Sequence, residues 1–200
     1  MEINDYNILT KSTEGYYKNK GSKFIAVAYY VENEADVKEA MALSKKKYYD
    51  ARHHCYAYRI TPEKEYTRSS DDGEPSGTAG KPILNQILSY GLYNTLIVVV
   101  RYFGGTKLGV SGLILAYKSA TRDLIQDAKV TKVFITRDVE LSFEYPLMNS
   151  VMKVIKDEKL SIFNQDFTKD CKISIKIRKD VLKNALGKLG KIRGVIITEL

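Results

Sequence analysis

The sequence predicts an α+β protein of two domains, residues 1–135 and 136–200. The length of 200 residues suits two modest domains. Strand-like alternating runs occur together with amphipathic helical stretches. Fourteen of the fifteen tyrosines lie between Tyr6 and Tyr117, so composition changes along the chain. No Gly/Ser-rich or Pro-rich linker divides the two parts, and we therefore expect closely coupled domains.

The C-terminal part has the clearest pattern. The expected strands are residues 137–143, 160–167, 171–177 and 195–198. Pro146 opens one amphipathic helix, Asp180 is expected to cap a second, and residues 168–170 form a turn between the middle strands. The resulting order, βαββαβ, is that of the ferredoxin-like sandwich, in which two helices cover one face of an antiparallel sheet.

The N-terminal part combines strands, helices and longer loops. Expected strands are residues 14–18, 23–30, 54–61 and 96–102. The segment Asn19-Lys20-Gly21 is typical of a hairpin turn, and Asn33 is placed to cap a helix. Two further helices are expected around residues 83–88 and 110–128. We expect a mixed sheet that is covered on one face by helices.

Composition excludes several classes of protein. The first residues lack the basic and apolar regions of a signal peptide. The longest aliphatic run, Leu96–Val100, is far shorter than the ~20 residues that cross a bilayer. Cys55 and Cys171 are too few for a disulfide framework. We therefore expect a cytoplasmic protein without a membrane partner, whose net charge of +8 is compatible with a polyanion such as RNA.

The strongest candidate for ligand binding is the glycine-rich segment Arg101–Gly109, between a buried strand and a helix. Its glycines, including Gly104 and Gly105, let the backbone approach a ligand closely. The first N–H groups of the helix favour an anion, and Arg101 and Lys107 add positive charge. An equally good explanation is that the glycines only turn the strand sharply into the helix.

A second candidate is the loop of residues 69–82. Asp71, Asp72 and Glu74 place three carboxylates within four positions, and such oxygens bind hard cations such as Mg²⁺. The alternative, which we prefer, is a surface turn whose acids cap backbone N–H groups. Neither a P-loop nor a nucleophile elbow is complete in the chain.

The run Arg52–Cys55 is a third candidate. In an extended strand, His53 and Cys55 lie on one face and His54 on the other. Residues two apart on a strand rarely reach nucleophile–base geometry, so we favour a core cysteine beside a histidine at the domain rim.

A basic segment with tyrosines is the last candidate. Its members are Lys45–Lys47, Tyr48, Tyr49, Arg52, Tyr56, Tyr58, Arg59 and Arg68. They would offer phosphate contacts and stacking platforms to single-stranded RNA. Alternatively, the lysines close a helix C-terminus and the tyrosines are ordinary strand packing.

Residues 80–109, together with residues 52–58 and 71–82, resemble the signature of the IMPACT/YigZ family in its bacterial two-domain form. The resemblance implies an N-terminal domain like domain 2 of ribosomal protein S5, and a C-terminal domain like the last domain of elongation factor G. Eukaryotic members of this family bind a ribosome-associated activator of a starvation-responsive kinase, and so restrain that kinase's control of translation initiation.

Three hypotheses of function follow. The first is a non-enzymatic, cofactor-free, translation-linked protein that contacts RNA, the ribosome or a ribosome-associated protein. Its expected anion contacts are Arg101, Lys107, Gly104 and Gly105, assisted by Arg52, Lys81 and His53. The second is a metal-dependent hydrolase or phosphotransfer enzyme that uses Asp71, Asp72 and Glu74. The third is a protein–protein adaptor that uses the tyrosine-rich face.

Overall fold

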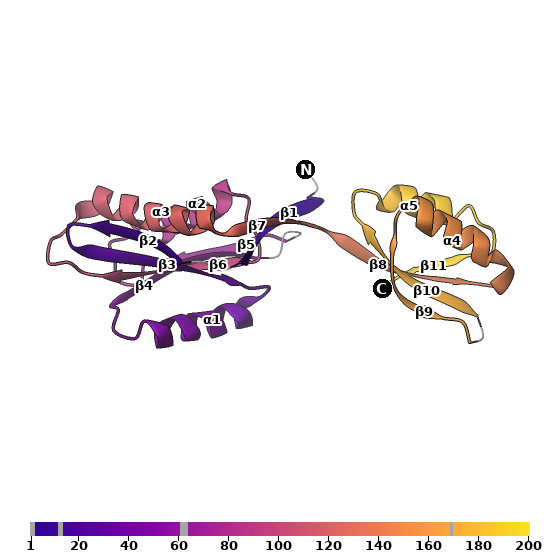
Figure 1. Ribbon diagram of the computed structural model, residues 1–200, viewed down its shortest axis with the longest axis horizontal. Helices are drawn as coiled ribbons and strands as arrows, with labels where there is room; N and C mark the ends of the chain where they lie inside the picture. The colour runs from indigo at the N-terminus through magenta and orange to yellow at the C-terminus, as the bar shows by residue number, and fades with distance from the viewer. Residues whose placement is uncertain (1–2, 12–13, 61–63, 169) are drawn as a thin grey trace. The chain divides into compact units, whose positions relative to one another are not determined.

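The computed structural model describes residues 3–11, 14–60, 64–168 and 170–200. The chain folds as an α+β protein of two compact units (Figure 1). The larger unit is Tyr6–Val133, and the smaller comprises Phe134–Leu200 with the first residues of the chain through Asp5. Within the described residues, no helix has the length and hydropathy needed to cross a membrane.

The larger unit is built on a five-stranded sheet. In spatial order its strands are β2 (Glu14–Asn19), β3 (Ser22–Tyr30), β6 (Thr95–Tyr102), β4 (His53–Ile60) and β5 (Tyr66–Ser70). Helices α2 (Gly80–Ser89) and α3 (Gly109–Asp127) cover one face, and α1 (Glu34–Lys47) covers the other (Figure 1). Strands β1 (Asp5–Lys11) and β7 (Lys129–Phe134) form a separate two-stranded sheet.

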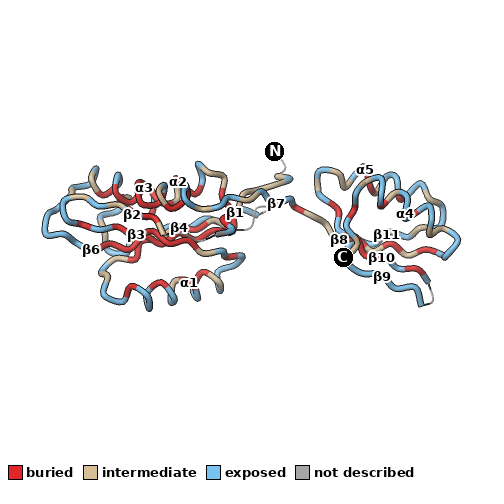
Figure 2. The backbone as a smooth tube through the Cα atoms, in the orientation of Figure 1, coloured by how far each residue is buried: buried red, intermediate tan, exposed pale blue. Residues whose placement is uncertain are grey.

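The mixed sheet with helices on one face, expected from the sequence, is wrong. Each pair of neighbouring strands in the five-stranded sheet is antiparallel, and helices lie on both faces. The central strand β6 explains the difference, because Leu96 to Val100 are all fully buried. Ile97 and Val99 pack under α2 and α3, whereas Leu96, Val98 and Val100 pack against α1. Figure 2 shows the buried backbone at the centre of this unit. A continuous apolar run is typical of such two-sided burial.

Local signals in this unit behave as the sequence predicts. The Asn33 side chain accepts hydrogen bonds from the backbone N–H groups of Ala35 and Asp36 at 2.9 and 3.0 Å, and so caps α1. Lys20 and Gly21 have φ angles of 45° and 77°, the left-handed pair that a two-residue type I′ hairpin turn requires. Strands β1, β5 and β7 were not among the expected elements.

The smaller unit has the predicted ferredoxin-like fold. Its sheet order is β11 (Ile196–Glu199), β8 (Thr136–Phe143), β10 (Cys171–Arg178) and β9 (Ser161–Asp166), with antiparallel neighbours. A 3₁₀ turn, η1 (Tyr145–Leu147), leads into α4 (Met148–Asp157), and α5 (Leu182–Leu189) precedes the last strand. The two α-helices cover one face of the sheet (Figure 1).

One expected cap in this unit is wrong. The N-cap of α5 is Val181, which makes no side-chain cap, and Asp180 instead accepts a hydrogen bond from Arg178 Nε at 3.0 Å. Arg178 Nη2 also contacts this carboxylate, so the guanidinium binds it with two donors. The expected turn at residues 168–170 includes Lys169, which lies outside the described residues.

Candidate functional site

The expected anion contact Arg101 is buried beneath the loop that precedes α2. In the strand register it lies between Phe24 on β3 and His53 on β4, so these three side chains share the sheet face that α2 and α3 cover. The Arg101 side chain is 8% exposed, and its Nη1 donates to Glu74 Oε1 at 2.7 Å. Glu74 is itself 4% exposed, so the pair is an internal ion pair.

Further polar groups join this pair. The hydroxyl of Tyr117 on α3 donates to the same Glu74 oxygen at 2.8 Å, and the Cys55 thiol donates to the Tyr117 oxygen at 3.3 Å. Burial raises the pKa of Cys55 to about 12. The thiol is therefore neutral at physiological pH and serves as a small buried donor, because a nucleophilic cysteine needs the thiolate form.

Asp71 holds the start of α2. Its Oδ1 accepts the N–H groups of Ala79 and Gly80 at 2.9 and 2.8 Å, and its Oδ2 accepts the N–H of Gly77 at 2.8 Å. Burial raises the pKa of this carboxyl, but the three hydrogen bonds outweigh burial and leave the pKa below its usual value. Asp71 thus caps the helix from eight residues away, while the N-cap residue Ala79 makes no side-chain cap.

The other loop carboxylates also bind protein donors. Asp72 Oδ2 accepts the His54 N–H at 2.6 Å, and the Asp72 carbonyl lies 2.8 Å from His53 Nδ1. Within the described part of the chain, no group of three or more His, Cys, Asp or Glu residues has the arrangement of a metal site. A cation bound by Asp71, Asp72 and Glu74 would have to displace these donors.

The glycines of the turn between β6 and α3 have backbone roles. A Cβ on Gly104 would lie 1.9 Å from the Gly21 carbonyl carbon, so Gly104 permits close contact with the β2–β3 turn. Gly105 and Gly109 have φ angles of 86° and 74°, which favour glycine. The turn therefore requires its glycines whether or not a ligand binds there.

Beside this turn lies a pocket of about 420 Å³, which we call the α3 pocket. Arg101 and Lys107 both line it, together with Glu74. The lining does not include the other sequence-predicted contacts: Arg52, His53, Lys81, Gly104 and Gly105. Lys81 lies instead in a separate pocket that Lys118 also lines.

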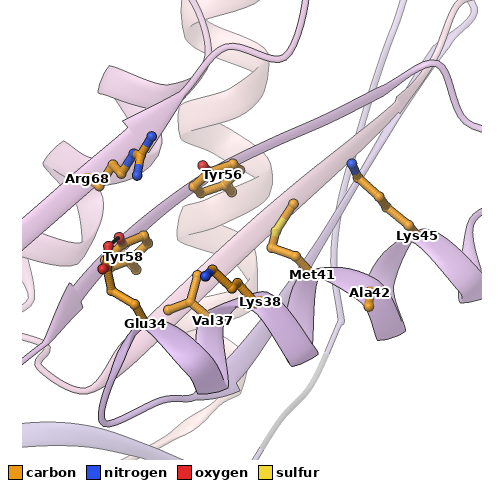
Figure 3. Close-up of a pocket in the computed structure, with 9 residues that line it drawn as sticks. All are labelled: Glu34, Val37, Lys38, Met41, Ala42, Lys45, Tyr56, Tyr58 and Arg68. Atoms are coloured by element: carbon orange, nitrogen blue, oxygen red, sulfur yellow. Dashed lines mark hydrogen bonds between the residues drawn. The ribbon is translucent and has the colours of Figure 1, made fainter.

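A second pocket, of about 430 Å³, lies on the opposite sheet face, between α1 and strands β4 and β5. We call it the α1 groove. Figure 3 shows Lys38, Met41 and Lys45 along the helix, with Tyr56, Tyr58 and Arg68 on the strands across from them. The rings of Tyr56 and Tyr58 are nearly parallel, with an interplanar angle of 5° and centroids 6.3 Å apart.

The α1 groove is electropositive. Lys38, Lys45 and Arg68 are exposed, and the lining includes a single carboxylate, Glu34. Glu34 Oε1 accepts the Tyr58 hydroxyl at 3.0 Å. Burial, followed by this hydrogen bond, raises the pKa of Tyr58, so its hydroxyl stays protonated and anchored while Tyr56 remains half-buried at the groove.

The structure brings together part of the basic, tyrosine-rich segment. The residues of this segment that line the α1 groove are Lys45, Tyr56, Tyr58 and Arg68. Lys47 instead pairs with Glu14. Arg59 lies over the Tyr93 ring, with its guanidinium carbon Cζ 3.5 Å from the ring centroid. Sequence reasoning missed Lys38. Its signal was available, because residues seven apart on a helix, such as Lys38 and Lys45, share a face.

These features lie in a region with known relatives. The sequence model described as Impact N-terminal domain matches residues 20–125, more than half of the chain. The chain therefore belongs to the IMPACT family. IMPACT family member YvyE of Bacillus subtilis is 35% identical over 68% of this chain and 63% of its own length. IMPACT family member YigZ of Escherichia coli is 31% identical over 74% of each chain.

Two solved structures are also similar. A protein described as hypothetical in its crystal structure is 24% identical, with a TM-score of 0.69 over 100% of this chain and 98% of its own, and so shares the fold along the whole length. The two-domain translational regulator Yih1 is 28% identical over 58% of this chain and 47% of its own, with a TM-score of 0.41.

Proposed function

We propose that this protein is a non-enzymatic, translation-linked regulator that contacts single-stranded RNA on the ribosome through the α1 groove. The link to translation rests on membership of the IMPACT family. The observation that carries the RNA contact is the α1 groove itself, where three exposed cations surround two parallel tyrosine rings.

The chemistry of the groove suits single-stranded RNA. Lys38, Lys45 and Arg68 are spaced around the opening and match the repeated charge of a phosphate backbone. Tyr56 presents a half-buried ring on which an unpaired base can stack. Tyr58, held by Glu34, keeps its ring parallel to the neighbouring Tyr56 ring.

Binding is favoured over catalysis by the state of the reactive groups. Both oxygens of Asp71 hold backbone N–H groups, Glu74 holds Arg101 and Tyr117, and the Cys55 thiol is neutral and buried. Of the contacts expected from the sequence, we keep the exposed Arg52 as an outlying phosphate contact. Arg101 and Lys107 line the α3 pocket on the other sheet face, next to Gly104 and Gly105, and are not part of this proposed contact. Lys81 and His53 also belong to that face and are left out of it.

The test is fluorescence anisotropy of a labelled 12-nucleotide oligouridine across a salt series, alongside co-sedimentation with ribosomes. Lys45→Ala should weaken binding and reduce the slope of log affinity against log salt concentration by about 0.7, the contribution of one phosphate contact to a single strand. Lys46→Ala is the matched control, because it removes another exposed charge from the same helix outside the groove.

Each outcome decides the proposal. Equal losses in the two variants would show general charge attraction and remove the α1 groove as the site. Absence of binding at low salt would refute RNA contact altogether. Ribosome binding that is insensitive to salt would instead favour a protein partner docked on the tyrosine-rich face.

A further inference from the structure

We propose that the α3 pocket binds a small organic carboxylate with an aromatic or branched apolar body. This site lies on the sheet face opposite the α1 groove, so it is separate from the proposed RNA contact. Its volume of about 420 Å³ falls in the usual range for small-molecule sites, roughly 300–1,000 Å³.

The polar end of the pocket holds a buried guanidinium with one unused donor. The Arg101 side chain is more than nine-tenths buried and lines the pocket, and its Nε has no hydrogen-bond partner. A buried donor without a partner is costly, so a ligand that reorients this guanidinium and accepts from it gains affinity. Lys107 adds a second positive charge from the pocket lining.

The N-terminus of α3 points to the same ligand. Gly109 and Val110, the first two residues of this 19-residue helix, line the pocket. The N-cap residue Leu108 offers no side-chain hydrogen bond to the helix. The first-turn N–H groups and the helix dipole therefore favour an anion here.

Charge balance selects a monoanion. Arg101 and Lys107 bring two positive charges, and Glu74 offsets one of them. One negative charge completes the balance, whereas a phosphate dianion would leave one negative charge in excess. A carboxylate also matches the planar guanidinium.

The remaining lining is apolar. Phe103 and Val110 are 56% and 60% exposed, although both are hydrophobic, and Leu113 is buried beneath them. Pro75 and Leu108 complete this apolar part of the pocket. An aromatic or branched apolar body would cover these side chains and remove them from water.

The test is an amide NMR titration of the full chain with phenylacetate, with the neutral phenylacetamide and inorganic phosphate as comparison probes. Phenylacetate should shift the amides of residues 103–113, with Kd on the order of 1 mM for a fragment of this size. Phenylacetamide should bind at least about tenfold more weakly, because it lacks the charge. Equal binding of acid and amide, shifts elsewhere, or no binding would overturn the proposal.

Two variants exclude indirect effects. Val110→Trp fills the pocket at an exposed position that a larger side chain can occupy without disturbing the core, and it should raise the phenylacetate Kd at least about tenfold. Val130→Trp makes the same change at another exposed valine and should leave the Kd unchanged. Equal effects in both would refute the pocket, as would phosphate that shifts the same amides as strongly as phenylacetate. Oligouridine binding by Val110→Trp should stay as in the parent protein, since the α1 groove lies on the other face.

Discussion

The two faces of the five-stranded sheet both carry charged side chains, but these are buried and paired on one face and exposed on the other. Strand β4 sends Cys55 and Ala57 to the face under α2 and α3, and Tyr58 to the face under α1. On the first face the charges of Arg101 and Glu74 are buried and neutralise each other. On the second face Arg68 and two lysines stay in solvent around an open groove. An arginine's contribution to binding is thus decided by the face on which it lies and by the acid that reaches it.

The largest expected effect comes from breaking the buried pair. Glu74→Ala should lower the free energy of unfolding by about 3–5 kcal/mol, because it leaves the Arg101 charge buried without its partner. Urea denaturation measures this change. The double variant Glu74→Leu with Arg101→Met should recover most of the loss, since it removes both charges together. A loss in the single variant no larger than that of a surface substitution would contradict the internal ion pair.

Removal of the α2 cap should have the next largest effect. Asp71→Ala should lower the free energy of unfolding by about 2–3 kcal/mol, since three backbone N–H groups lose a charged acceptor. Asp157→Ala serves as a control at an exposed carboxylate.

The same carboxylate predicts a pH dependence with a definite sign. Because the native pKa of Asp71 lies below its ordinary value of 3.8, its contribution is present above that value and is lost as pH falls through the native pKa. In urea denaturation between pH 5 and pH 2, the free energy of unfolding should therefore fall less steeply with decreasing pH in Asp71→Ala than in the parent protein. Parallel curves would show that Asp71 is not preferentially ionised in the native state.

The smallest effect is expected at His54, on the α1 face. Burial lowers its pKa below 6.5, opposed by the nearby Asp72 charge, and its Nε2 is buried without a hydrogen-bond partner. The unfolded chain therefore takes up the proton first, so stability should fall as pH drops below about 6.5. His54→Gln should remove that part of the pH dependence in thermal melts between pH 7.5 and pH 5. An unchanged profile would place the titration on another group.

Much of the fold and part of the candidate site could be predicted from the sequence. The ferredoxin-like order followed from alternating strands and two amphipathic helices, and the Asn33 cap and the Lys20-Gly21 turn followed from local chemistry. Lys45, Tyr56, Tyr58 and Arg68 were singled out together because cations and tyrosines cluster in that segment. The positions of the RNA contacts and the carboxylate site stay predictions that the experiments above address. The division of the chain at residue 135 also stays a prediction.

By itself, then, the sequence determined what depends on neighbours along the chain: the Asn33 helix cap, the Lys20-Gly21 turn, strand alternation and the family signature. The tertiary structure alone decided which face each helix covers and which charges meet. Glu74 neutralises Arg101 across 27 positions, and Asp72 accepts the His54 N–H across 18 positions. The physical reason is that burial and pairing depend on which strands and loops become neighbours in space. The free energy of a charge changes far more with burial and pairing than with its neighbours in sequence.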